Sequence, residues 1–125
     1  MAKRVLIVDD EWSIRQVLEA RLVACGFEVL TACDGPAGIS AAKEELPDAI
    51  LLDLRMPEMD GFEVLRRLKE SGSAGEIPVI FLTANIHDTA KDRARAAGCA
   101  GFLTKPYDAR SVVTAIDFAT GSHAA

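Results

Sequence analysis

The sequence has no long apolar run and no excess of positive charge, and both deficits limit what the protein can be. Its longest apolar runs, such as residues 5–8, are far shorter than the roughly 20 residues that span a bilayer as a helix. No signal-peptide core follows Lys3 and Arg4. A net charge of −5 disfavours direct binding to nucleic acid, which is a polyanion. We therefore expect a cytoplasmic protein with no membrane partner and no direct nucleic-acid partner.

Cysteine is scarce as well. Cys25, Cys33 and Cys99 are scattered, odd in number and not in the spacing of metal ligands. This distribution disfavours disulfides and a zinc site, so we predict that the cysteines are small buried apolar side chains.

The remaining pattern predicts one α/β domain over residues 1–120, followed by a frayed tail at 121–125. Five strand-like runs alternate with five helical patterns, which favours a single doubly wound parallel sheet with helices on both faces. The expected strands are 4–8, 27–31, 49–53, 77–82 and 101–104, and the expected helices are 13–25, 35–46, 62–70, 86–97 and 109–119.

Some local signals place these elements more closely. Ser13 and Gln16 fit a capping box, and Asp108 is a plausible N-cap for the last helix. The run 27–31 is more polar than the others, which indicates a strand near the edge of the sheet. The pair Asp60-Gly61 indicates a turn in which Gly61 is free to adopt a positive φ.

Polar side chains follow the predicted strands where each strand ends. Asp9 and Asp10 follow the first strand, Asp53 ends the third, Thr83 follows the fourth and Lys105 follows the fifth. In open α/β sheets, ligands bind at the carboxyl ends of the strands. Clustered carboxylates repel one another unless a cation joins them, and oxygen ligands suit a hard ion such as Mg²⁺. Because a carboxylate can also attack phosphorus, the pattern predicts a metal-dependent phosphoryl site.

With these residues the chain resembles the receiver domain of response regulators in two-component signal transduction. The motifs that carry the resemblance are Val8-Asp9-Asp10-Glu11, the segment 53–61, Leu82-Thr83-Ala84 and Lys105-Pro106. The resemblance implies a flavodoxin-like fold with strand order 2-1-3-4-5 and a cis peptide bond before Pro106.

The resemblance also implies roles for individual residues. Asp53 is the expected phosphoacceptor. Asp10 and Asp53 are expected to bind Mg²⁺ directly, with Mn²⁺ as an alternative ion, while Asp9 acts through water. Arg55 is expected to offer its backbone carbonyl to the metal.

Three further residues complete the implied site and its switch. Thr83 and Lys105 are expected to bind the phosphoryl group. Thr83 and Phe102, together with the fourth helix, are expected to change the partner-binding surface. For Phe102, a buried core ring remains an alternative to the switch role.

The implied function is a phosphorylation-gated switch in a phosphorelay, not an enzyme beyond promoting its own phosphorylation and dephosphorylation. The donor is a histidine kinase or a phosphotransfer protein, and the target is a downstream protein or an output domain. A phosphorylation-dependent homodimer stays open. The sequence favours a stand-alone, chemotaxis-regulator-like protein, although the receiver part of a longer regulator would look the same.

Three alternatives fit less well. A phosphatase of the haloacid dehalogenase type also uses a strand-end Asp, but it needs a second Asp where this chain has Arg55. A flavodoxin-like small-molecule binder needs a phosphate-cradling loop after the first strand, where the acids Asp9 and Asp10 stand. An atypical receiver that acts without phosphorylation remains the third alternative.

Overall fold

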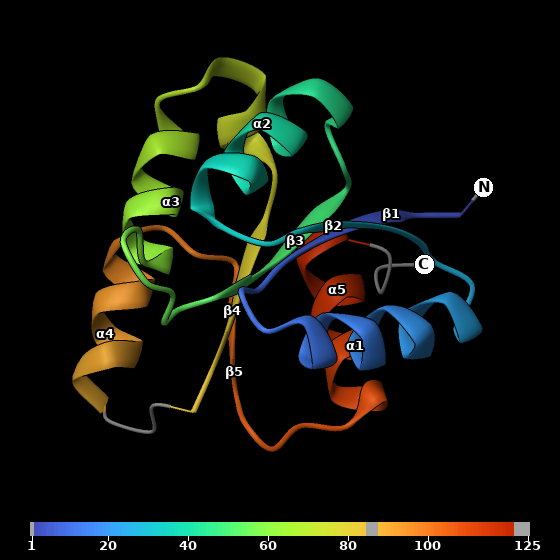
Figure 1. The fold of residues 1–125 in the computed structure, drawn as a ribbon. Coiled ribbons are helices and arrows are strands. Elements are labelled where there is room, and N and C mark those ends of the chain that lie inside the picture. Colours follow the sequence, from blue (N-terminus) through green and yellow to red (C-terminus); the bar gives the residue numbers. More distant parts are fainter. Residues whose placement is uncertain (1, 85–87, 122–125) are drawn as a thin grey trace.

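A computed structural model describes residues 2–84 and 88–121, which form a five-stranded sheet with helices on both faces (Figure 1). The strand order is β2-β1-β3-β4-β5, and every neighbouring pair is parallel. The strands are β1 Arg4–Val8, β2 Glu28–Ala32, β3 Ala49–Asp53, β4 Val79–Thr83 and β5 Gly101–Thr104. The predicted flavodoxin-like order is therefore confirmed, and the more polar run lies in the edge strand β2.

The helices divide between the two faces of the sheet. They are α1 Trp12–Ala24, α2 Gly35–Glu45, α3 Gly61–Lys69, α4 Asp88–Ala96 and α5 Ala109–Thr120, with a 3₁₀ turn η1 at Gly72–Glu76. Helices α1 and α5 pack on one face, and α2, α3 and α4 pack on the other (Figure 1).

Successive side chains of the central strands point alternately to the two faces of the sheet and so contribute to the hydrophobic core on each face. In β1, Leu6 and Val8 contribute to the core beneath α2 and α3, whereas Val5 and Ile7 contribute to the core beneath α1 and α5. Successive side chains of a strand point to opposite faces, so a strand covered on both sides must be apolar throughout. This requirement explains the continuous apolar runs in the sequence.

Among the side chains of α4 that the structure describes, those of residues 90–96, the buried ones are small. Its inward residues Ala90 and Ala94 are buried, and they offer little apolar area. Across the gap to α3, the guanidinium of Arg93 lies 3.9 Å from the centroid of the Phe62 ring, which is a cation–π contact. The described side chains of α4 therefore bury little apolar area against the rest of the fold.

The predicted start of the first helix is wrong. Helix α1 begins at Trp12 with Glu11 as N-cap, and no side chain caps it, so Ser13 does not form a capping box. The reason lies in the preceding turn, where the backbone N–H of Glu11 donates to Asp9 Oδ1 over 2.9 Å. This bond turns the chain into helical conformation before Ser13 is reached. The predicted N-cap Asp108 does accept the N–H of Ser111, at 2.8 Å.

The prediction that the cysteines are buried is wrong for two of them. Cys25 and Cys33 are exposed, and Cys99 is partly buried. Cys25 follows the end of α1 and Cys33 lies between β2 and α2. Both positions are in connections, which run over the surface instead of through the core.

Two other predictions extend beyond the described residues. The predicted fourth helix began at Ile86, and Ile86 and His87 lie outside the described ranges. Within them, α4 covers Asp88–Ala96. Of the predicted frayed tail, positions 122–125 are likewise outside the described part.

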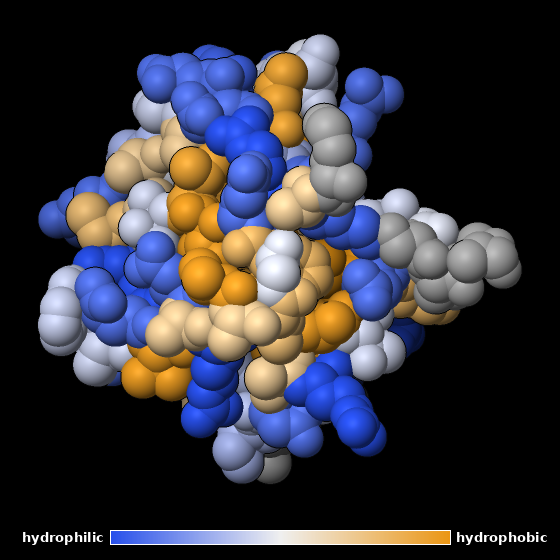
Figure 2. All heavy atoms as spheres, turned by 90° about the vertical axis from the view of Figure 1, so that its right-hand side faces the viewer, coloured by the Kyte–Doolittle hydropathy of each residue, from blue (hydrophilic) through white to orange (hydrophobic). Residues whose placement is uncertain are grey.

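The end of the sheet where β1 begins carries apolar surface. Figure 2 faces the side where β1 starts and α1 ends, and apolar side chains gather at its centre among hydrophilic ones. Val23 near the end of α1 is 55% exposed. Among the helices of the described residues, none combines the length and apolar character that a membrane crossing requires.

Candidate functional site

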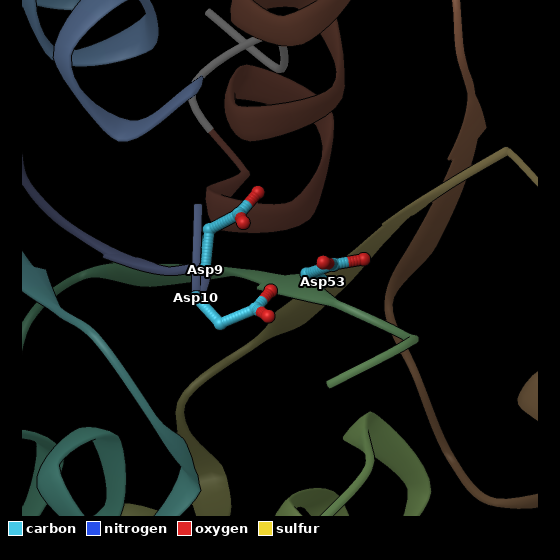
Figure 3. A group of neighbouring side chains, drawn as sticks. All are labelled: Asp9, Asp10 and Asp53. Atoms are coloured by element: carbon cyan, nitrogen blue, oxygen red, sulfur yellow. The ribbon is translucent and has the colours of Figure 1, made fainter. Parts of the chain in front are cut away.

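Strand register brings the carboxylates together. Val8 of β1 pairs with Leu52 of β3, so Asp9 and Asp53 stand side by side one residue further on. Figure 3 shows Asp9 and Asp10 at the end of β1 and Asp53 at the end of β3, gathered at one edge of the sheet. One oxygen from each of the three carboxylates lies within 4.8 Å of the others. The predicted acidic cluster is thus present in the fold.

Burial dominates the protonation of this cluster. The exposed fractions of Asp9 and Asp53 are 2% and 5%. The pKa of Asp53 is raised to about 6, chiefly by burial and then by the nearby Asp9 carboxylate, while Lys105 opposes the shift. Burial also raises the pKa of Asp9, against the opposing effects of the Glu11 N–H and Lys105. The carboxylates therefore need a positive charge if all are to be ionised together.

The hydrogen bonds leave one carboxylate oxygen without a partner. The Arg55 N–H donates to Asp53 Oδ1 over 3.2 Å, and Glu11 occupies Asp9 Oδ1. Asp9 Oδ2 is buried and has no hydrogen-bond partner among the described residues. A buried acceptor is normally satisfied, so this oxygen beside two further carboxylates fits a bound cation or its water. An all-oxygen donor set suits Mg²⁺.

The loop after Asp53 folds back tightly on the strand. The N–H of Gly61 donates to the Leu54 carbonyl at 2.9 Å. A Cβ at Gly61 would stand 2.9 Å from the carbonyl oxygen of Asp53 and from Leu54 Cα. Gly61 does not use its freedom to adopt a positive φ, and the left-handed residue of this loop is Glu58, with φ 68°. Gly61 is needed for its small size, and it opens α3 behind the N-cap Asp60.

Thr83 and Lys105 stand at the ends of the next two strands. Asp53 pairs with Leu82, which places Thr83 one residue beyond it on β4, and Thr83 is 1% exposed. The N–H of Lys105 donates to the Thr83 carbonyl at 2.7 Å. The Lys105 charge opposes the rise in the pKa of both Asp9 and Asp53, so it lies close enough to act on both acids. The peptide bond from Lys105 to Pro106 is cis.

Phe102 lies on β5, partly buried against the core beneath α3 and α4. Its ring meets the fully buried Phe81 edge-on, with centroids 6.5 Å apart. Phe81 in turn lies 5.4 Å from the Phe62 ring. Phe102 therefore has both a core contact and exposed area, and the switch role remains a prediction.

Sequence reasoning missed two residues near the acids. Arg15 of α1 donates from Nη1 to the Asp9 carbonyl over 2.7 Å. Tyr107 is half buried, and burial, with added effects of Asp9 and Asp53, raises the pKa of its hydroxyl to about 12. The position of Tyr107 directly after Lys105-Pro106 was a usable signal. For Arg15 nothing in the sequence showed which way the long side chain would turn.

Comparison with known families gives one match over most of the chain. A model described as the response regulator receiver domain matches residues 5–117.

Two relatives illustrate the range of proteins that contain similar sequences. The response regulator PleD of Caulobacter vibrioides is 46% identical over 110 residues, covering 86% of this chain but 24% of PleD. The protein PilH of Pseudomonas aeruginosa is 36% identical over 114 residues, covering 91% of this chain and 94% of PilH. This chain also spans about half the length of several transcriptional regulators that it matches.

A solved structure matches the fold closely. The receiver domain of a sensor histidine kinase from Pseudomonas aeruginosa, with a magnesium ion coordinated in its active-site cleft, has a TM-score of 0.88 and 28% identity. The match covers 97% of this chain and 99% of that one.

Proposed function

The chain belongs to the family of response regulator receiver domains, and from this premise we propose that it is a phosphorylation-gated signalling switch with Asp53 as phosphoacceptor. The observation that carries the proposal is the convergence of Asp9, Asp10 and Asp53 at one sheet edge, with a buried Asp9 oxygen left without a partner in the described structure. Residues 1–120 form the receiver unit. The phosphoryl donor is a histidine kinase or a phosphotransfer protein.

The acidic cluster is where the metal would bind. Asp10 and Asp53 would bind Mg²⁺ directly, Asp9 would bind through water and Arg55 would offer its backbone carbonyl. When bound, Mg²⁺ supplies positive charge against the repulsion among carboxylates and phosphoryl oxygens. The donor set supports this assignment, because it consists of oxygen atoms alone.

Side chains of the protein carry out the transfer of the phosphoryl group itself. A carboxylate oxygen of Asp53 forms a bond to phosphorus while the bond from phosphorus to the donor's nitrogen breaks, and the imidazole leaves. With a pKa of about 6, Asp53 is mostly ionised and nucleophilic at pH 7. Lys105 pairs with a phosphoryl oxygen, and the Thr83 hydroxyl donates to another.

Gating follows from the strands beyond Asp53. Movement of Thr83 toward the phosphoryl group frees space at β4, into which the Phe102 ring turns. Helix α4 shifts with it, because its buried Ala90 and Ala94 offer little apolar area and the Arg93 cation–π contact is weak enough to be re-formed. The phosphoryl group thus selects between two arrangements of one surface, and a downstream protein or an output domain binds the selected one. A homodimer of the phosphorylated form is a second use of the same surface.

Hydrogen–deuterium exchange tests the gating. The protein is incubated with Mg²⁺, with and without acetyl phosphate, and deuterium uptake is followed by peptide. We expect uptake to change in peptides that contain α4 and β5 as well as in the loop after Asp53. The Asp53→Asn variant should show no such change. A change confined to the loop, or one that the variant reproduces, would contradict a gated surface.

A further inference from the structure

Arg15 is the one arginine of α1 whose side chain reaches the acidic loop in the described structure. It lies in the first turn of the helix and is half buried. Its backbone N–H donates to the Glu11 carbonyl at 3.1 Å, and its Nη1 donates to the Asp9 carbonyl at 2.7 Å. A single residue thus closes the connection between β1 and α1 at two points.

The contact made by Arg15 falls where the sheet ladder has ended. The pairing of β1 with β3 stops at Val8, so the Asp9 carbonyl lies beyond the last residue pair of that ladder. On the other side, the Asp9 N–H still donates to the Ala32 carbonyl at 3.2 Å. Arg15 gives the Asp9 carbonyl a charged donor instead of a strand partner, and such bonds are about twice as strong as neutral ones.

Fixing this carbonyl also fixes the direction of Asp10. The carbonyl of Asp9 and the N–H of Asp10 belong to one planar peptide unit. Holding that plane constrains the rotation on either side of it, and so sets how the Asp10 side chain leaves the backbone. The Asp10 carboxylate itself is exposed, and its neighbours Asp9 and Asp53 are acids that repel it. Without the tie to Arg15, the exposed Asp10 would have more freedom to move away from the two buried acids.

We infer that Arg15 is a positioning residue for the cation site, holding the Asp9–Asp10 turn so that the three carboxylates converge before the metal arrives. This inference rests on the proposed function. Pre-organisation of ligands increases metal affinity, because less rearrangement is needed on binding.

The proposal is open to a sharp test because the charge of Arg15 has the opposite effect. A guanidinium beside an acidic cluster repels Mg²⁺, so removing the charge alone would tighten binding. Removing the positioning hydrogen bond would weaken binding. The sign of the change in dissociation constant therefore decides between the two effects.

The experiment compares Arg15→Met, Arg15→Lys and Arg21→Met with the wild type. Met keeps the length and apolar stem of Arg15, and Lys keeps its charge without the planar fork. Arg21→Met removes the same charge from an exposed position on the same helix. Isothermal titration with Mg²⁺ gives the dissociation constants, and the rate of Asp53 phosphorylation by acetyl phosphate is measured at low and saturating Mg²⁺.

We expect the Mg²⁺ dissociation constant of Arg15→Met to rise about tenfold, the lower end of what loss of a supporting contact around a metal costs. The dissociation constant of Arg15→Lys should rise less, and that of Arg21→Met should equal the wild-type value. The phosphorylation rate of Arg15→Met should fall at low Mg²⁺ and recover at saturation, which a general loss of structure would not allow.

Several results would overturn the inference. An unchanged or smaller dissociation constant in Arg15→Met would show that charge, not position, is the main effect. A phosphorylation rate that stays low at saturating Mg²⁺ would show that Arg15 does not act by positioning the metal ligands. If Arg15→Met does not fold, a wild-type dissociation constant in Arg15→Lys contradicts the inference equally. Absence of Mg²⁺ binding by the wild type would instead refute the proposed function.

Discussion

Asp53→Asn is expected to raise the free energy of unfolding of the metal-free protein at pH 7 by about 2 kcal/mol. Burial beside Asp9 lifts the pKa of Asp53 from 3.8 to about 6, so the fold disfavours its ionised form. At pH 7 the wild type must nevertheless ionise this buried group. Asparagine fills nearly the same space without a charge.

The pH dependence of this difference follows from the direction of the shift. A carboxyl whose pKa is raised by folding stabilises the folded state below its unfolded pKa, and loses that contribution as the pH rises through the folded pKa. For Asp53 the window lies between about pH 4 and pH 6. The difference in free energy of unfolding between Asp53→Asn and the wild type should therefore decrease as the pH falls from 7 to 4.

Urea unfolding in the presence of EDTA measures this effect. Asp92→Asn is the matched control, because Asp92 is 76% exposed and makes a 3.8 Å ion pair with the exposed Arg95. Its stability should stay within about 0.5 kcal/mol of the wild type across the same pH range. Saturating Mg²⁺ should make the wild type more stable to urea than Asp53→Asn, because a ligand stabilises the folded protein that binds it. A metal-free Asp53→Asn that is less stable than the wild type at pH 7 would contradict the raised pKa.

Gly61→Ala is expected to lower the free energy of unfolding by about 2–3 kcal/mol, as overpacking does in tight sites. The added Cβ would stand 2.9 Å from the Asp53 carbonyl oxygen and from Leu54 Cα, and 3.0 Å from the Phe81 ring. The first two of these atoms belong to the backbone that carries the phosphoacceptor. Relief of the clash must therefore displace Asp53, and misplacement of a reacting group slows transfer by an order of magnitude or more.

The measurements are urea unfolding and the rate of phosphorylation by acetyl phosphate at saturating Mg²⁺. Gly101→Ala is the control, because the three atoms nearest to its Cβ would all belong to the Ile80 side chain, at 3.4 Å or more. We expect this control to retain both stability and rate. A Gly61→Ala protein with the wild-type rate would show that the close approach of α3 to β3 does not set the position of Asp53.

The sequence was sufficient for the sheet and for the acidic cluster. Apolar runs that end in acids predict both a buried parallel strand and the edge where its last residue lies, so the sequence alone predicts that Asp9, Asp10 and Asp53 converge. The strand order itself came from the resemblance to receiver domains, because periodicity does not say which strands are neighbours.

Other features depended on geometry that a sequence pattern does not contain. The start of α1 was missed because Asp9 turns the chain at Glu11 before the capping signal at Ser13. The role of Gly61 was misread because its closeness to β3 is a tertiary contact and not a property of the turn. The direction of Arg15 was not predictable, because a long side chain on a first helical turn can point to solvent or to the loop.

Intact mass after incubation with acetyl phosphate tests the central claim most directly, with wild type and Asp53→Asn each measured in Mg²⁺ and in EDTA. The account predicts that the wild type gains the mass of one phosphoryl group in Mg²⁺ only, and that Asp53→Asn gains none. Asp48→Asn, which alters a carboxylate that hydrogen-bonds the Arg4 N–H at the opposite end of the sheet, should behave as the wild type. No gain in the wild type, or a gain that persists in Asp53→Asn, would contradict Asp53 as the phosphoacceptor.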